Sequence, residues 1–381
     1  MSKIAAARQA AYGTLLAVER GKWSTETLAA KSAHLDPRDA GLASDIVFGT
    51  LRRRGQLDAI ASKCSSRPIE KLDVEIRVVL EMAIYQCRFL DRVPDHAVVN
   101  DAVELARRAG KVSAASFVNA ILRRIIRDEV VAADAESTPN WLLQRWQAQY
   151  GADLAQGIAA ASLRTPGRYI RVGDCEPPPG ATPTDVAGCY LLASGDPGAF
   201  RFQDISSQAV VPLLDLEAGQ TFLDVCAAPG NKTAQAMETP IRAVACELHA
   251  SRALGLKSMA IPVVVADARS PLPFSRKFDR ILVDAPCSGT GTLARNPEIK
   301  WNLKPEDLTD LQSRQKAILR NALEQLAPGG KLVYSTCSLE PEENEEVLNN
   351  CGAMIVQTMQ RIPGRDAGDG FFAAVLQNAG Q

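Results

Sequence analysis

No apolar run in the sequence approaches the roughly 20 residues that a membrane-spanning helix needs. Residues 1–22 are broken by charges and lack the apolar segment and cleavage site of a signal peptide. These absences argue against a membrane-embedded or secreted protein, so we expect a cytoplasmic one with no membrane partner. The composition, 46% hydrophobic and 23% charged, is that of an ordinary folded chain, and 381 residues suffice for two or three domains.

Cysteine pairs at metal-ligand spacing are also missing. The nine cysteines are an odd number, and no CxxC pair occurs among them. A disulfide framework and a structural zinc site are both disfavoured, and we expect no metal. In a reducing compartment most free cysteines are small buried apolar side chains. Five fit this interpretation, because each lies in or beside an apolar segment: Cys64, Cys87, Cys189, Cys226 and Cys246.

The net charge of −1 conceals an uneven distribution. Residues 1–128 contain 21 Lys and Arg against 15 Asp and Glu, whereas residues 129–381 contain 22 against 29. A basic front part permits contact with nucleic acid, but this excess is too small to establish it.

The front part of the chain has the pattern of helices. Apolar residues recur at helical spacing through residues 4–127, and Asp36-Pro37 and Pro94-Asp95 mark turns and helix caps. We therefore predict an all-helical domain of roughly five to seven helices over residues 1–128. Residues 129–140 are acidic and rich in small side chains, which indicates a linker. Residues 141–205 begin as one amphipathic helix and continue as short β-like pieces, RYIRV, CYLLA and AFRFQ, which indicates a small α+β bridging unit.

The remainder, residues 206–381, alternates between strands and helices. TFLDVC, RAVAC, PVVVA, RILVD and KLVYST are short apolar runs, each followed by loop-like or helical sequence. Buried parallel strands have this pattern, and the alternation predicts a doubly wound, Rossmann-like α/β sheet. Ligands bind such sheets at the carboxyl ends of the strands, where all the sharp motifs of this sequence lie.

Three of these motifs suggest a nucleotide-type cofactor. The turn Asp224–Thr233, DVCAAPGNKT, follows the first strand and is neither GxGxxG nor a P-loop; many such turns are only tight connections. Glu247 ends the next strand, where an acid can bind both ribose hydroxyls, although a solvated strand end is the simpler interpretation. Asp267 ends the third strand and could meet the amine of an adenine, but a helix N-cap is equally plausible.

Two further motifs place cysteines just beyond neighbouring strands. Cys287 lies in DAPCSGTG, which starts at Asp284, and Cys337 lies in YSTCS, which is followed by Pro341–Asn344. Either cysteine alone would be a buried structural thiol. Two at equivalent positions, in loops of Gly, Ser and Thr, favour reactive thiols.

The motifs DVCAAPGNKT, DAPCSGTG, NPEIKW and STCSLEPEEN together resemble the signatures of the RNA cytosine-5 methyltransferase family. The likeness is greatest to its bacterial 16S rRNA branch, the Sun/Fmu type, whose members carry an N-terminal domain like the antitermination factor NusB. The helical front part looks like that domain, and the segment DGFFAAVL resembles the family's last strand, so the likeness spans nearly the whole chain.

The resemblance implies a role for each motif. S-adenosylmethionine would be the cofactor and RNA, with 16S rRNA expected, the substrate. Glu247 would bind the ribose, Asp267 the adenine, and Asp284 would lie where cofactor and cytosine meet. Cys337 would be the nucleophile and Cys287 would assist product release; spacing alone cannot rank the two. The methionine part of the cofactor would lie on the turn formed by Cys226, Ala227, Ala228, Pro229, Gly230, Asn231 and Lys232.

The chemistry of C5 methylation explains the need for a thiol. Cytosine C5 is too weak a nucleophile until a thiolate adds at C6, and the C5 proton and the thiol must afterwards leave. A free cysteine is only a few per cent thiolate near pH 7, so we expect an environment that lowers the pKa of Cys337. Lys232 is a candidate for the positive charge, or else a plain surface residue at a helix start. The family usually has Gly where Asn231 stands, and Asn in the region of Gly173.

Three alternatives stay open. The same reaction on tRNA or another RNA would need the same motifs. A methyltransferase-like RNA-binding or assembly factor would bind cofactor without transferring methyl, although both cysteines and all three carboxylates are present. A nicotinamide dehydrogenase on a similar sheet would lack its GxGxxG turn and leave both cysteines unexplained.

Overall fold

The computed structural model describes residues 4–378, which form two compact units. The first comprises Met1–Arg164 together with Leu293–Asn302, and the second comprises Thr165–Thr292 together with Leu303–Gln381. The chain therefore passes between the units at three points along the sequence. Within residues 4–378, no helix has the length and apolar character needed to cross a membrane.

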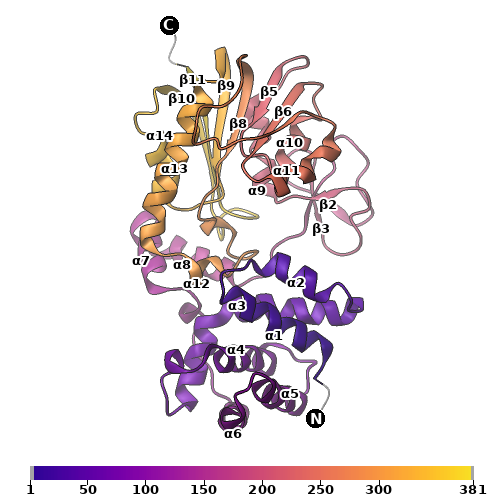
Figure 1. The fold of residues 1–381 in the computed structure, drawn as a ribbon, viewed down its shortest axis with the longest axis vertical. Helices are drawn as coiled ribbons and strands as arrows, with labels where there is room; N and C mark the ends of the chain where they lie inside the picture. The colour runs from indigo at the N-terminus through magenta and orange to yellow at the C-terminus, as the bar shows by residue number, and fades with distance from the viewer. Residues whose placement is uncertain (1–3, 379–381) are drawn as a thin grey trace. The chain divides into compact units, whose positions relative to one another are not determined.

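Helices build the first unit, as predicted, and six of them lie before residue 128 (Figure 1). Asp36 caps the longest of these helices by accepting hydrogen bonds from the N–H groups of Arg38 and Asp39, with Pro37 in the first position. Their apolar faces enclose one core in which Ile46, Leu57 and Val79 are fully buried. The six are α1 (Ala6–Val18), α2 (Ser24–Ser32), α3 (Pro37–Cys64), α4 (Val74–Phe89), α5 (Asp95–Arg108) and α6 (Ala115–Arg127).

Two more helices, α7 (Asn140–Tyr150) and α8 (Ala152–Ser162), also belong to this unit. The sequence predicted one helix here and grouped it with the bridging unit. Gly151 divides the segment, because its φ of +81° lies in the left-handed region, outside the helical range. The helices join the first unit through η3 (Asp134–Ser137), which packs on both α3 and α8.

The segment Leu293–Asn302 belongs to the helical unit, although the residues before and after it in the sequence belong to the second unit. Glu298 accepts hydrogen bonds from the N–H and hydroxyl groups of Ser24, at 3.0 and 2.7 Å. Trp301 Nε1 donates to the carbonyl of Leu51 at 2.6 Å, and Lys300 Nζ donates to the carbonyl of Arg52 at 2.8 Å. NPEIKW, one of the family motifs, is therefore part of the helical unit's own packing.

A small antiparallel sheet begins the second unit. Its strands are β1 (Tyr169–Arg171), β2 (Ala181–Pro183), β3 (Cys189–Leu192) and β4 (Arg201–Phe202), in the order β2-β3-β1-β4. Three of the strands fall in the β-like pieces predicted from sequence. Ile170 and Leu192 are buried in its own small core, and Gly173 follows β1.

The large sheet contains seven strands in the order β10-β11-β9-β8-β5-β6-β7. The five predicted strands are β5 (Thr221–Asp224), β6 (Arg242–Glu247), β7 (Val263–Val265), β8 (Phe278–Asp284) and β9 (Leu326–Thr336), and all run parallel. The last strand, β11 (Phe371–Asn378), runs antiparallel to β9, and β10 (Ala353–Arg361) runs antiparallel to β11. The Rossmann-like prediction is confirmed, with β10 as an unpredicted edge strand.

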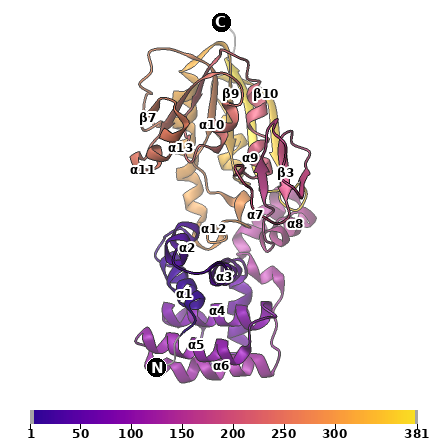
Figure 2. The ribbon, with the colours of Figure 1, turned by 90° about the vertical axis from the view of Figure 1, so that its right-hand side faces the viewer.

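Helices cover both faces of this sheet (Figure 2). On one face α13 (Pro305–Leu323) and α14 (Glu345–Leu348) pack on Ile281, Leu332 and Tyr334. On the other, η4 (Val211–Leu214) and α10 (Asn231–Ala236) pack on Phe222 and Val333, and α11 (Ala250–Leu256) lies beside β6 and β7. The strand order reverses between β5 and β8, and their carboxyl ends frame the crevice in which such sheets bind ligands.

Candidate active site

The turn Cys226–Lys232 leaves β5 and leads into α10. Gly230 has φ of +103°, and a Cβ placed there would lie 2.1 Å from Cε of Met259, so only glycine fits. Asn231 is the first residue of α10, and its φ is not positive. The replacement of the family's usual glycine at 231 is therefore compatible with the backbone, because the demanding position is 230.

Three carboxylates at strand ends lie at one edge of the sheet: those of Glu247 and Asp267, which the sequence analysis singled out, and that of Asp224, to which it gave no role. Glu247 is buried, and its carboxylate accepts the N–H groups of Ala228, at 3.3 Å, and His249, at 3.0 Å. Asp267 is half-buried and binds the backbone and guanidinium of Arg269, which hold the pKa of its carboxyl below the usual value. Asp224, at the end of β5, is buried beneath the turn.

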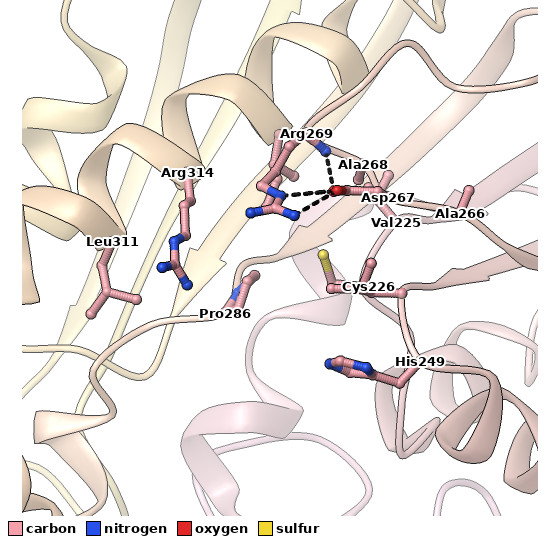
Figure 3. A pocket seen from close by; sticks show the side chains of 12 residues that line it. Val225, Cys226, His249, Ala266, Asp267, Ala268, Arg269, Pro286, Leu311 and Arg314 are labelled. Atoms are coloured by element: carbon pink, nitrogen blue, oxygen red, sulfur yellow. Dashed lines mark hydrogen bonds and ion pairs between the residues drawn. The ribbon is translucent and has the colours of Figure 1, made fainter.

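A cavity of about 370 Å³ opens at the carboxyl ends of β5, β6 and β7. Figure 3 shows Cys226, Asp267 and Pro286 around it, with His249 at one side and Arg314 of α13 at the other. Most of its lining is apolar and a few polar groups point into it, which is the usual character of a site for a cofactor.

Asp224 carries an unusual buried oxygen. Its Oδ2 accepts the hydroxyl of Thr233 at 2.7 Å, whereas Oδ1 has no hydrogen-bond partner among residues 4–378. Burial raises the pKa of this carboxyl to about 7, and the nearby charge of Asp284 acts in the same direction. An unpartnered acceptor at this depth is costly unless a ligand supplies a donor.

Lys232 and Asp284 form an ion pair between α10 and β8. Lys232 Nζ lies 2.6 Å from Asp284 Oδ2 and 4.8 Å from the ring centroid of Phe371. The hydroxyl of Ser335 donates to the other oxygen of Asp284 at 2.9 Å. The sequence offered Lys232 as a positive charge for Cys337; its hydrogen-bonded partner is instead Asp284.

The two cysteines meet beyond the ends of β8 and β9. Asp284 pairs with Ser335 in the parallel register, and the following loops bring Cys287 Sγ within 3.4 Å of Cys337 Sγ. Both side chains are half-buried. The hydrogen bond with Cys337 and burial raise the pKa of the Cys287 thiol well above its usual value, so Cys287 stays protonated at neutral pH.

All nine cysteines are free thiols in the structure. Burial raises the pKa values of the thiols of the five cysteines that the sequence assigned to the core, Cys64, Cys87, Cys189, Cys226 and Cys246.

Sequence reasoning left out several residues that organise this site. Thr233 and Ser335 fix the carboxylates of Asp224 and Asp284. Glu343 binds the loops of both cysteines and is wholly buried. The motif that contains it, Pro341–Asn344, is visible in the sequence, but the sequence analysis gave Glu343 no role.

The strand order and the cavity at the switch point define a Rossmann-like α/β domain with a ligand-binding crevice. The family description "16S rRNA methyltransferase RsmB/F" matches residues 211–377, and the NusB family matches residues 5–127. The chain is 32% identical over 366 residues to the probable ribosomal RNA small subunit methyltransferase B of Bacillus subtilis, a match that covers 84% of this chain and 81% of the relative. Identity is also 32% over 410 residues with the ribosomal RNA small subunit methyltransferase B of Cronobacter sakazakii, covering 94% and 95%.

A solved structure agrees with these sequence relatives. The crystal structure of PH0851 matches with a TM-score of 0.81 at 20% identity, covering 99% of this chain and 100% of that chain, which shows a shared fold. The chain belongs to the RsmB/F family of S-adenosylmethionine-dependent methyltransferases. The predictions of family, helical NusB domain, Rossmann-like domain and cofactor are confirmed.

Proposed function

We propose that the protein methylates C5 of a specific cytosine in RNA, with 16S rRNA as the RNA, through a covalent bond between Cys337 and C6. The observation that carries this proposal is the pair of thiols 3.4 Å apart at the ends of adjacent parallel strands, beside Asp284. The names of the relatives in Bacillus subtilis and Cronobacter sakazakii support ribosomal RNA as the substrate.

The residues around the cavity fit S-adenosylmethionine. The unpartnered Oδ1 of Asp224 offers an acceptor for the ammonium group of the methionine part, next to the turn Cys226–Lys232. Glu247 would accept the ribose hydroxyls, and Asp267, which lines the cavity, would accept the adenine amine. The bound cofactor supplies an electrophilic methyl group.

The two thiols have different roles in the remaining steps. The Cys337 thiolate adds to C6, and the electron pair of the C5–C6 double bond moves toward C5, which becomes nucleophilic enough to take a methyl group. Water takes the C5 proton, the electron pair of that C–H bond re-forms the C5–C6 double bond, and the bond between Sγ and C6 breaks so that Sγ leaves as a thiolate. Cys287, held protonated beside Cys337, assists this release, and Asp284 hydrogen-bonds the base edge.

The protonation of Cys287 supports this ranking of the cysteines. Its raised pKa leaves it a poor nucleophile at neutral pH, since only the thiolate attacks. The target base must be unpaired or flipped, because C6 is inaccessible to a thiol inside a stacked helix. We assign RNA binding to the helical unit, with its basic excess before residue 129.

The test is direct methylation. The full chain is incubated with labelled S-adenosylmethionine and 16S rRNA, small ribosomal subunits or tRNA, and nucleosides are identified by mass spectrometry. We expect 5-methylcytidine at one site of 16S rRNA and none with Cys337→Ala. If only tRNA were methylated, tRNA and not 16S rRNA would be the substrate. A methyl group on another atom, or cofactor binding without methyl transfer, would overturn the proposal.

A further inference from the structure

One carboxylate joins the residues beside both thiols. Glu343, in η7 (Pro341–Glu343), accepts the N–H of Ser288 with Oε1 at 2.8 Å. Its Oε2 accepts the hydroxyl of Ser288 and the hydroxyl of Ser338, the latter at 2.5 Å. Ser288 directly follows Cys287, and Ser338 directly follows Cys337. The separation of the two loops is therefore set through a single side chain.

Glu343 is itself held from two directions. Its backbone carbonyl accepts the hydroxyl of Tyr334 at 2.7 Å. Gln315, from α13, donates to Oε1 at 3.0 Å and to the carbonyl of Pro286 at 3.0 Å. The carboxylate is thus anchored to β9 and α13, the rigid elements under the two loops, and has no freedom to follow either loop alone.

Hydrogen-bond donors surround the buried carboxylate of Glu343. Both serine hydroxyls donate their single protons to Oε2, which must therefore act as an acceptor. Ser338 Oγ in turn accepts the N–H of Glu340 at 3.0 Å. These partners of the carboxylate, Ser288, Ser338 and Gln315, are all neutral. A carboxylate at this depth is unfavourable unless its hydrogen bonds compensate.

The carboxylate of Glu343 also affects the pKa of the Cys287 thiol. The hydrogen bond with Cys337 and burial are the main causes of the raised pKa of Cys287, and the charges of Cys337, Glu343 and Asp284 add to them. Tyr334 faces the same thiol and is itself protonated, because burial raises its pKa well above the usual value. The charge of Glu343 therefore favours the neutral form of Cys287.

We propose that Glu343 is a positioning residue that fixes the distance between the two cysteine loops and keeps Cys287 protonated, so that Cys337 alone attacks the base. This inference rests on the function proposed above. Glu343 touches neither thiol in this account and acts through Ser288 and Ser338.

Glu343→Gln tests the proposal because it preserves the shape of the side chain and removes its charge. Glu346→Gln is the matched control, since Glu346 lies three residues further along the chain, is exposed, and accepts a hydrogen bond from Gln312 on the surface. With the full chain, we expect Glu343→Gln to lower kcat about 10- to 100-fold, as a small misplacement of reacting groups does, while KM for S-adenosylmethionine is unchanged. Glu346→Gln should match the unsubstituted protein.

A second measurement needs neither RNA nor turnover. Iodoacetamide alkylation of each cysteine is followed by mass spectrometry from pH 7 to 10, because only thiolates react. In Glu343→Gln the profile of Cys287 should move to lower pH, whereas in Glu346→Gln it should stay in place. A purely structural role would change folding or overall accessibility without moving this profile selectively.

Each outcome decides the matter. An unshifted Cys287 profile, or full kcat in Glu343→Gln, overturns the proposal. If Glu343→Gln does not fold, Ser338→Ala keeps the carboxylate and removes only its link to the Cys337 loop; a normal kcat in that variant overturns the proposal, and a 10-fold or greater loss supports it. If the unsubstituted protein forms no 5-methylcytidine but the Cys287 profile still shifts, the proposed function fails and the effect of Glu343 on the thiol stands.

Discussion

Asp224→Asn should stabilise the protein without cofactor, and increasingly so as the pH rises. The carboxyl titrates near 3.8 when exposed and at about 7 when folded, because it is buried. The folded state therefore binds more protons than the unfolded state between these values, and the unfolding free energy falls as pH rises through this window. One pH unit corresponds to about 1.4 kcal/mol per titrating proton. The free energy of unfolding of the unsubstituted protein should therefore be about 2.5 kcal/mol lower at pH 8 than at pH 5.

Asparagine escapes this cost because its amide does not titrate, and its oxygen can still accept the hydroxyl of Thr233. Thermal unfolding of both proteins at pH 5 and pH 8 measures the effect. The Tm advantage of Asp224→Asn should widen by roughly 5–10 °C between the two, at about 2–4 °C per kcal/mol. A pH-independent difference in Tm would refute the argument that Asp224 is protonated by burial. Calorimetry should also show weaker S-adenosylmethionine binding by the variant at pH 8.

Two further predictions concern a buried group in each unit. Glu247→Ala should weaken S-adenosylmethionine binding by about 1–3 kcal/mol, the scale of a lost charge-assisted hydrogen bond, and unchanged affinity by calorimetry of the folded variant would remove Glu247 from the site. Burial lowers the pKa of Lys300 from 10.5 to about 7, so the unsubstituted protein loses stability as pH falls toward 7. Lys300→Met removes this loss and should therefore raise the free energy of unfolding by about 2.5 kcal/mol more at pH 6 than at pH 9. Chemical unfolding at both pH values checks this, and a larger gain at pH 9 would contradict the sign.

The sequence predicted the large sheet well because its central strands are buried on both faces. Phe222 and Leu282 lie in uninterrupted apolar runs, which is the pattern of parallel strands covered by helices. The edge strand β10 escaped prediction because one side of it has no neighbour, and its residues Met354 and Val356 are exposed. Without burial there is no periodic pattern to detect.

Long-range packing was invisible in the sequence. Trp301 and Lys300 lie between two strands of the second unit along the chain, but their hydrogen bonds are to Leu51 and Arg52 of the helical unit. Removal of residues 1–128 would leave both without these partners, so truncation is a poor test of the helical domain, and point substitutions are needed.

The candidate site was predictable in its residues but not in its contacts. Motif positions at strand ends placed Cys287 and Cys337 at one edge, whereas their separation depends on loop conformations and on Glu343. The ion pair between Lys232 and Asp284 likewise depends on how α10 packs relative to β8, which no local sequence pattern encodes.

A denaturing gel of the two cysteine variants with substrate RNA and S-adenosylmethionine tests the central claim most directly. Cys337→Ala should form no covalent RNA complex and no 5-methylcytidine. Cys287→Ala should attack and methylate once, and then remain attached as a shifted band that protease removes. A shifted band for Cys337→Ala and none for Cys287→Ala would reverse the roles, and continued turnover by Cys337→Ala would contradict the covalent mechanism.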